Sequence, residues 1–111
     1  MKTTDRKAAL AAYRERKVEC GIYALRCLAT GEVWAGSAPN LATIRNRHWF
    51  TLRMGSHTVH SLQSAWHVHG EQAMEFEVVE RLADDVAAMS RDRMLKERLT
   101  HWLAALGAQR I

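Results

Sequence analysis

Two aromatic residues, Tyr23 and Trp34, stand eleven positions apart in the segment CGIYALRCLATGEVWAGS (residues 20–37), and each has a glycine two positions away, Gly21 and Gly36. A buried strand pair alone does not need these glycines, because glycine weakens a strand and packs no side chain. A phenol hydroxyl can donate or accept a hydrogen bond and can lose its proton, whereas an indole can only donate. Tyr23 is therefore one candidate for acid–base chemistry, and simple packing of both rings explains the same pattern equally well.

A long segment of the chain carries no acidic residue. Between Val33 and Gly70 there is no Asp or Glu, while Arg45, Arg47, Arg53 and five of the six histidines fall within it. The whole chain has 16 basic and 12 acidic residues, a net charge of +4. A surface built from this segment would have the positive potential that suits phosphate groups. A solvated basic surface without a ligand explains the same charge equally well.

The histidines allow several interpretations. His48 and His57 are candidates to donate hydrogen bonds to phosphate. The pairs His57 and His60, and His67 and His69, have zinc-like spacings but lack a matching carboxylate or thiol, so a zinc site is disfavoured. Exposed loop histidines without a ligand are the remaining interpretation.

The hydrophobic spacing predicts the elements that must position these residues. Asn40 is expected to cap a helix that Gly55 ends, and Gly70 is expected to end the next helix. The predicted strands are 21–28, 33–37 and 76–82, and the predicted helices are 41–54, 60–70 and 84–106. An additional helix is predicted near the amino terminus.

The size of the chain limits it to one core, because 111 residues with 48% apolar content cannot build two. We expect an N-terminal helical extension over 1–19 and one domain over 20–111. The fold class is α/β, with a small three-stranded, mainly antiparallel sheet flanked by helices. Cys20 and Cys27, seven residues apart, should lie on opposite faces of one strand as reduced thiols. No apolar run is long enough for a signal peptide or membrane span, so we expect a cytoplasmic protein without a membrane partner.

The ordered motifs resemble the GIY-YIG nuclease family, in particular the catalytic domains of homing endonucleases. The matching elements are Gly21-Ile22-Tyr23, Trp34-Ala35-Gly36 and the following Ser37 and Asn40-Leu41. The resemblance continues through the helix with Arg47 and His48, the segments SLQSAWHVHG and FEVVERL, and the terminal THWL, over roughly residues 20–104. It implies a fold of GIY-YIG type and hydrolysis of a phosphodiester bond.

In this family a tyrosine lies close to the attacking water, an arginine stabilises the phosphate charge and a glutamate holds one divalent cation. The resemblance implies Tyr23 for the first role. The usual arginine and glutamate positions are Ile44 and Leu99 here, so Arg47 and Glu97 are the catalytic candidates, with Glu97 as the ligand of Mg²⁺ or Mn²⁺. Such a cation neutralises charge on the phosphate and prefers carboxylate oxygen.

The resemblance also implies DNA as the partner. The residues expected to contact it are Trp34, Gly36, Ser37, Asn40, Arg45, His48 and Arg53. Two functions follow: a DNA-cleaving nuclease domain, with full or reduced activity, and a non-catalytic nucleic-acid-binding or interaction module with a degenerate active site.

Overall fold

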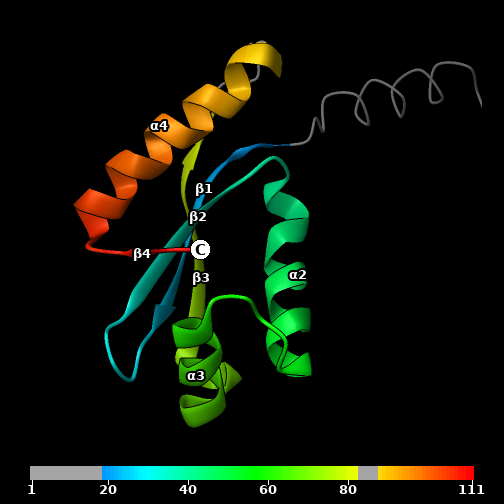
Figure 1. The fold of residues 1–111 in the computed structure, drawn as a ribbon, viewed down its shortest axis with the longest axis vertical. Coiled ribbons are helices and arrows are strands. Elements are labelled where there is room, and N and C mark those ends of the chain that lie inside the picture. Colours follow the sequence, from blue (N-terminus) through cyan, green and yellow to red (C-terminus); the bar gives the residue numbers. More distant parts are fainter. Residues whose placement is uncertain (1–18, 83–87) are drawn as a thin grey trace, which may run out of the picture.

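The computed structural model describes residues 19–82 and 88–111, with only the backbone described at positions 88 and 89. One sheet runs through it in the strand order β3-β1-β2-β4 (Figure 1). The central strand β1 (Gly21–Cys27) pairs antiparallel with both β2 (Val33–Ala38) and β3 (Met74–Arg81). The two-residue strand β4 (Gln109–Arg110) pairs parallel with β2. The prediction of three strands missed β4, because two residues are too few to show an alternating pattern.

Helices cover both faces of this sheet. Helices α2 (Leu41–Met54) and α3 (His60–His69) pack on one face, where Leu25 and Trp34 meet Leu52 and Leu62. Helix α4 (Ala88–Leu106) packs on the other face, where its buried leucines meet Ile22. Figure 1 shows α2 and α4 on opposite sides of the strands. Because neighbouring residues of a strand point to opposite faces, Tyr23 faces α2 while Ile22 faces α4.

Two polar or flexible residues fix the ends of α2, as the sequence predicted. The side-chain oxygen of Asn40 accepts a hydrogen bond from the backbone N–H of Ala42 at 3.0 Å, which satisfies one of the free donors at the helix start. Gly55 ends the helix at φ +72°, in the left-handed region that glycine adopts without strain. A short 3₁₀ helix, η1 (Glu71–Ala73), connects α3 to β3.

The two glycines of the hairpin each allow a close approach. A Cβ atom at Gly36 would lie 2.6 Å from the hydroxyl oxygen of Tyr23, which is its cross-strand partner. A Cβ atom at Gly21 would collide with the carbonyl oxygen of Glu80, next to the bulge at which the pairing of β1 and β3 shifts register. Gly36 therefore makes room for the tyrosine ring, and Gly21 makes room for the third strand.

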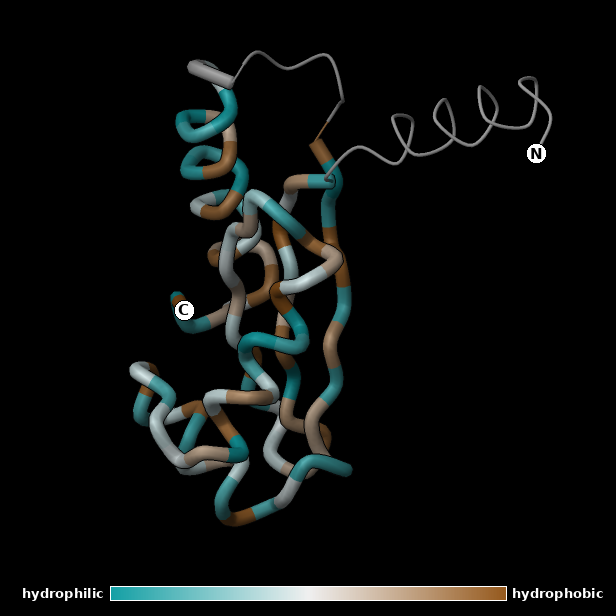
Figure 2. The backbone as a smooth tube through the Cα atoms, turned by 90° about the vertical axis from the view of Figure 1, so that its right-hand side faces the viewer, coloured by the Kyte–Doolittle hydropathy of each residue, from teal (hydrophilic) through white to brown (hydrophobic). Residues whose placement is uncertain are grey.

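Hydrophobic and hydrophilic residues alternate over residues 74–78 of β3, the long strand at the right of Figure 2. This period of two follows from a strand with one face towards the core. Cys20 and Cys27 are buried free thiols in separate core clusters, as expected. The predicted N-terminal helix and the start of the predicted last helix lie outside the described residues. Within the described ranges, no helix is both long and apolar enough to cross a bilayer.

Candidate functional site

Tyr23 is the centre of the candidate site. It lies in β1 with its ring buried between the sheet and α2, and it is stacked on Phe76 of β3 with ring centroids 5.6 Å apart. Because Gly36 has no side chain, the ring lies flat across β2, and the hydroxyl reaches His48 of α2. The phenol is thus held by rigid elements on three sides.

Two histidines continue from this hydroxyl as a hydrogen-bonded chain. The oxygen of Tyr23 is 2.5 Å from Nε2 of His48, and Nδ1 of His48 is 2.8 Å from Nε2 of His57. His48 is half-buried on the sheet-facing side of α2, and His57 is buried in the loop that follows this helix. The chain therefore joins the sheet, the helix and the loop.

The far end of this chain sets the direction of its hydrogen bonds. The backbone N–H of Val59 donates to Nδ1 of His57 at 3.0 Å. A neutral imidazole has one N–H and one acceptor nitrogen, so His57 carries its proton on Nε2 and donates to Nδ1 of His48. His48 then carries its proton on Nε2 and donates to the oxygen of Tyr23. The hydroxyl proton of Tyr23 is therefore free to point towards a ligand.

The loop that carries His57 is fixed by one glutamine of α3. Gln63 accepts a hydrogen bond from the backbone N–H of His57 at 3.1 Å and donates one to the carbonyl oxygen of Leu52 at 3.1 Å. These two bonds attach the loop to both α2 and α3. Gln63 thereby acts as a positioning residue for the histidine chain.

The pKa values of the three groups shift in the directions that keep them neutral. Burial raises the pKa of Tyr23 well above its ordinary value of 10, although Arg47 nearby acts in the lowering direction. Burial, together with the charges of His57 and Arg47, lowers the pKa of His48 to about 4. Burial also lowers the pKa of His57. At neutral pH the chain therefore consists of one phenol and two neutral imidazoles.

A hollow of about 230 Å³, here called the tyrosine hollow, opens over the hydrogen-bonded side chains of Tyr23, His48 and His57. Arg47 supplies its positive charge, and the hydroxyl groups of Ser56 and Thr58 line its loop side. The full lining is Tyr23, Ile44, Arg47, His48, Thr51, Ser56, His57, Thr58 and Ile111. A cation, several hydroxyl groups and no carboxylate side chain among these residues make the hollow suited to an anion such as a phosphate.

Two solved structures are similar to this chain in fold. The catalytic domain of the homing endonuclease I-TevI superposes with a TM-score of 0.70 at 24% identity, covering 83% of this chain and 97% of that one. A glutamate-to-alanine mutant of the catalytic domain of the intron endonuclease I-TevI gives a TM-score of 0.68 at 25% identity, covering 80% and 84%. The chain has the GIY-YIG catalytic-domain fold. No family model matches the sequence, and no curated protein matches it.

Within this GIY-YIG fold, Tyr23, Arg47 and His48 come together at the tyrosine hollow. Ile44, at the usual arginine position, lines the same hollow, and Arg47 one turn later supplies a guanidinium there. The sequence did not predict that His57 would join Tyr23 through His48. Its only signal was the placement of His48 and His57 in the acid-free segment.

The other residues predicted to contact DNA lie elsewhere in the GIY-YIG fold. Trp34 is fully buried and donates its indole N–H to Ser61 at 2.9 Å. Arg45 lies over the ring of Trp49, with its guanidinium carbon 5.3 Å from the ring centroid. Arg53 forms an ion pair with Glu71 at 2.6 Å.

The remaining members of that predicted set are close to the hairpin and the start of α2. Gly36 lies beneath the ring of Tyr23, and Asn40 is engaged as the helix cap. Ser37 is half-buried and pairs with Ile22, which places it on the α4 face of the sheet. None of the three is among the residues that line the tyrosine hollow.

The acidic residues of α4 and β3 lie on the face of the sheet opposite Tyr23. Glu97 is exposed on α4. Glu80 accepts hydrogen bonds from Arg98 and from the indole of Trp102, both at 2.7 Å. Burial acts to raise the pKa of Glu80, but these two hydrogen bonds and the charges of Arg98 and His101 together outweigh it, and the pKa is lowered. Glu80 is thus an ionised residue that links β3 to α4.

Proposed function

We propose that this chain is a nuclease domain that hydrolyses phosphodiester bonds of DNA at the tyrosine hollow. The observation that carries the proposal is the hydroxyl of Tyr23, hydrogen-bonded by His48 at the floor of the hollow with Arg47 beside it. The similarity in fold to an endonuclease catalytic domain supports this reaction class. The basic segment between residues 33 and 70 supports DNA as the partner.

Arg47 binds the phosphate and stabilises the charge that develops on it during attack. The phenolate form of Tyr23 accepts a proton from water, and the N–H of His48 stabilises this phenolate. The water oxygen then bonds to phosphorus, the bond from phosphorus to the leaving oxygen breaks, and the leaving oxygen takes a proton from solvent. Because each imidazole donates its hydrogen bond towards Tyr23, the phenolate faces the N–H of His48 and not an acceptor nitrogen.

The phenolate is scarce at neutral pH, because burial raises the pKa of Tyr23 above 10. At pH 7 fewer than about one molecule in a thousand carries it, since each pKa unit corresponds to a tenfold change in population. A strong base that is rarely formed gives a slow enzyme at pH 7 whose rate rises with pH.

The family resemblance implies a divalent cation, Mg²⁺ or Mn²⁺, with Glu97 as its ligand. Mg²⁺ prefers carboxylate and other hard oxygen ligands. Among the described residues that line the tyrosine hollow there is no Asp or Glu, and Glu97 is exposed on a helix that packs on the other face of the sheet. The described lining does not fit such a cation, so we derive no catalytic step through it. The involvement of Glu97 is a hypothesis for mutagenesis.

A non-catalytic nucleic-acid-binding or interaction module is the second candidate. Its support is the same lack of an Asp or Glu in the described lining, together with Ile44 at the usual arginine position. An anion-binding hollow without a resident metal ligand would bind a phosphate backbone without cleaving it.

The test is DNA cleavage and DNA binding measured side by side. We expect the protein to nick supercoiled plasmid, and we expect His48→Ala, which removes the donor to the phenolate, to slow nicking on the order of 100-fold. His101→Ala, at an exposed histidine of α4, is the matched control and should cut at the wild-type rate. Assays in Mg²⁺, in Mn²⁺ and in EDTA show whether a cation is required.

Three outcomes separate the hypotheses. Glu97→Gln should lose on the order of 100-fold in rate if Glu97 holds the cation, and equal rates would remove it as the ligand. Binding in a gel-shift assay without cleavage in either cation would replace the nuclease proposal with the binding module. An absence of both binding and cleavage would reject DNA as the partner.

A further inference from the structure

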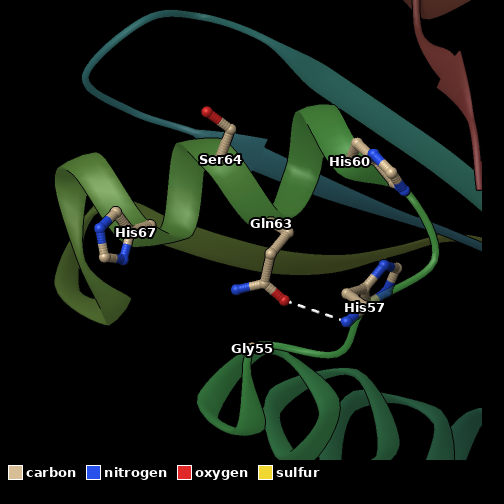
Figure 3. A pocket seen from close by; sticks show the side chains of 6 residues that line it. All are labelled: Gly55, His57, His60, Gln63, Ser64 and His67. Carbon is tan, nitrogen blue, oxygen red and sulfur yellow. Dashed lines mark hydrogen bonds between the residues drawn. The ribbon is translucent and has the colours of Figure 1, made fainter.

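A second hollow lies next to the tyrosine hollow, between the end of α2 and one face of α3. It has a volume of about 450 Å³, roughly twice that of its neighbour. The residues that line it, shown in Figure 3, are Gly55, His57, His60, Gln63, Ser64 and His67. We call it the histidine hollow.

Three of these side chains form a polar row along α3. His60, Ser64 and His67 follow one another at spacings of four and three, so they share one face of the helix. All three are exposed, and among the described residues none has a side-chain hydrogen-bond partner. Gln63, by contrast, already uses its amide to hold the loop. The row therefore offers two imidazoles and one hydroxyl to a ligand.

The chemistry of the row favours an anionic ligand rich in acceptors. No Asp or Glu occurs between residues 33 and 70, and the next acid, Glu71, is paired with Arg53. A phosphate accepts hydrogen bonds on all its free oxygens, and both imidazole N–H and serine O–H groups donate. A metal ion is disfavoured, because no group of three metal-ligating side chains comes together within the described ranges 19–82 and 88–111.

The two hollows are joined by one residue. His57 lines both of them, and its Nε2 atom is the one that contacts His48 towards Tyr23. The two hollows therefore adjoin at His57, and a strand with one phosphate at Tyr23 would have the row of α3 next to it. The geometry points to the histidine hollow as the binding site for a neighbouring phosphate of the same nucleic-acid strand. This inference rests on the proposed function for the identity of the ligand.

The experiment compares two double variants in the full chain. His60→Ala with His67→Ala removes both imidazoles of the row and leaves no side-chain donor in their place. His69→Ala with His101→Ala removes two exposed histidines that line neither hollow, and it is the matched control. Both are measured for affinity by fluorescence anisotropy with a labelled 12-nucleotide single strand and with the corresponding duplex, and for single-turnover cleavage at saturating protein.

We expect the His60 and His67 variant to bind about tenfold more weakly, the effect of losing two ordinary hydrogen bonds to the phosphate. The control should bind as the wild type does. At saturating protein the cleavage rate of the variant should stay within about twofold of wild type, because the row does not touch the reacting atoms.

The possible results are distinct for the two proposals. Equal affinity of the His60 and His67 variant and wild type would overturn the histidine hollow as a subsite and leave the nuclease proposal untouched. Weakened binding in a protein that does not cleave would support the subsite and reject catalysis. A wild-type protein that binds neither the single strand nor the duplex would overturn both.

Discussion

Substituting Gly36 by alanine should displace the ring of Tyr23. The new Cβ atom would lie 2.6 Å from the hydroxyl oxygen and 2.9 Å from the adjacent ring carbon of Tyr23, closer than real Cβ contacts. The ring must move by about 0.8 Å to reach an ordinary van der Waals distance of 3.4 Å. A shift of that size away from β2 breaks or distorts the 2.5 Å hydrogen bond to His48.

Two effects determine the expected magnitude. Overpacking a filled core costs about 1–3 kcal/mol, and loss of the hydrogen bond costs about 1 kcal/mol. We therefore expect Gly36→Ala to lower the free energy of unfolding by about 2–4 kcal/mol. Urea denaturation followed by tryptophan fluorescence measures this change. The cleavage rate should fall with it, because the phenol no longer receives the His48 N–H.

Gly31→Ala provides the matched control. Gly31 has φ +80° and nothing within 4 Å of an added Cβ, so alanine there strains the backbone of the turn without touching Tyr23. We expect it to lower stability by about 1 kcal/mol and to leave the cleavage rate of the folded protein unchanged. If Gly36→Ala kept wild-type stability and wild-type cleavage, the argument that this glycine positions Tyr23 would be refuted.

Three further predictions concern charge. First, kcat/KM for cleavage should rise about tenfold per pH unit from pH 7 to pH 9.5, because the pKa of Tyr23 lies above 10; a pH–rate profile that levels off below pH 8 would contradict the phenolate as the base. Second, the pKa of His48 is about 4 in the folded chain and 6.5 in the unfolded one. The unfolded chain therefore binds more protons, and the free energy of unfolding should fall as the pH drops from 6.5 to 4. Urea titrations across this range should show that dependence, and His48→Gln should weaken it. Third, Glu80→Gln weakens the hydrogen bonds from Arg98 and Trp102. It should lower the free energy of unfolding by about 1–2 kcal/mol, which thermal denaturation measures, without changing the cleavage rate.

The sequence predicted the elements well where the signals were local. The oxygen of Asn40 and the positive φ of Gly55 mark the two ends of α2, and both signals depend only on residues within a few positions. The two strands of the hairpin were also predicted, and within them Tyr23 pairs with Gly36. The strand β4 gave no such signal, since its two residues are too few to show an alternating pattern and it forms by pairing with β2, which is distant in the sequence.

The chemistry of the site was harder to predict, because it depends on contacts between distant residues. Tyr23 and His48 are 25 positions apart and meet only when α2 packs on the sheet. Residue spacing also did not predict that burial raises the pKa of Tyr23 by more than Arg47 lowers it. Residue spacing does not show how deeply Tyr23 is buried. Nor does it show that the backbone N–H of Val59 fixes the direction of the hydrogen bonds from His57 through His48 to Tyr23.

Single-turnover cleavage of DNA by Tyr23→Phe is the most direct test of the central claim. The substitution keeps the ring on Phe76 and removes only the hydroxyl that His48 contacts. Our account predicts a rate at least about 100-fold below wild type, with DNA affinity within about threefold, because Arg47 still holds the phosphate. A Tyr23→Phe protein that cleaves at the wild-type rate would contradict the assignment of this hydroxyl as the catalytic base.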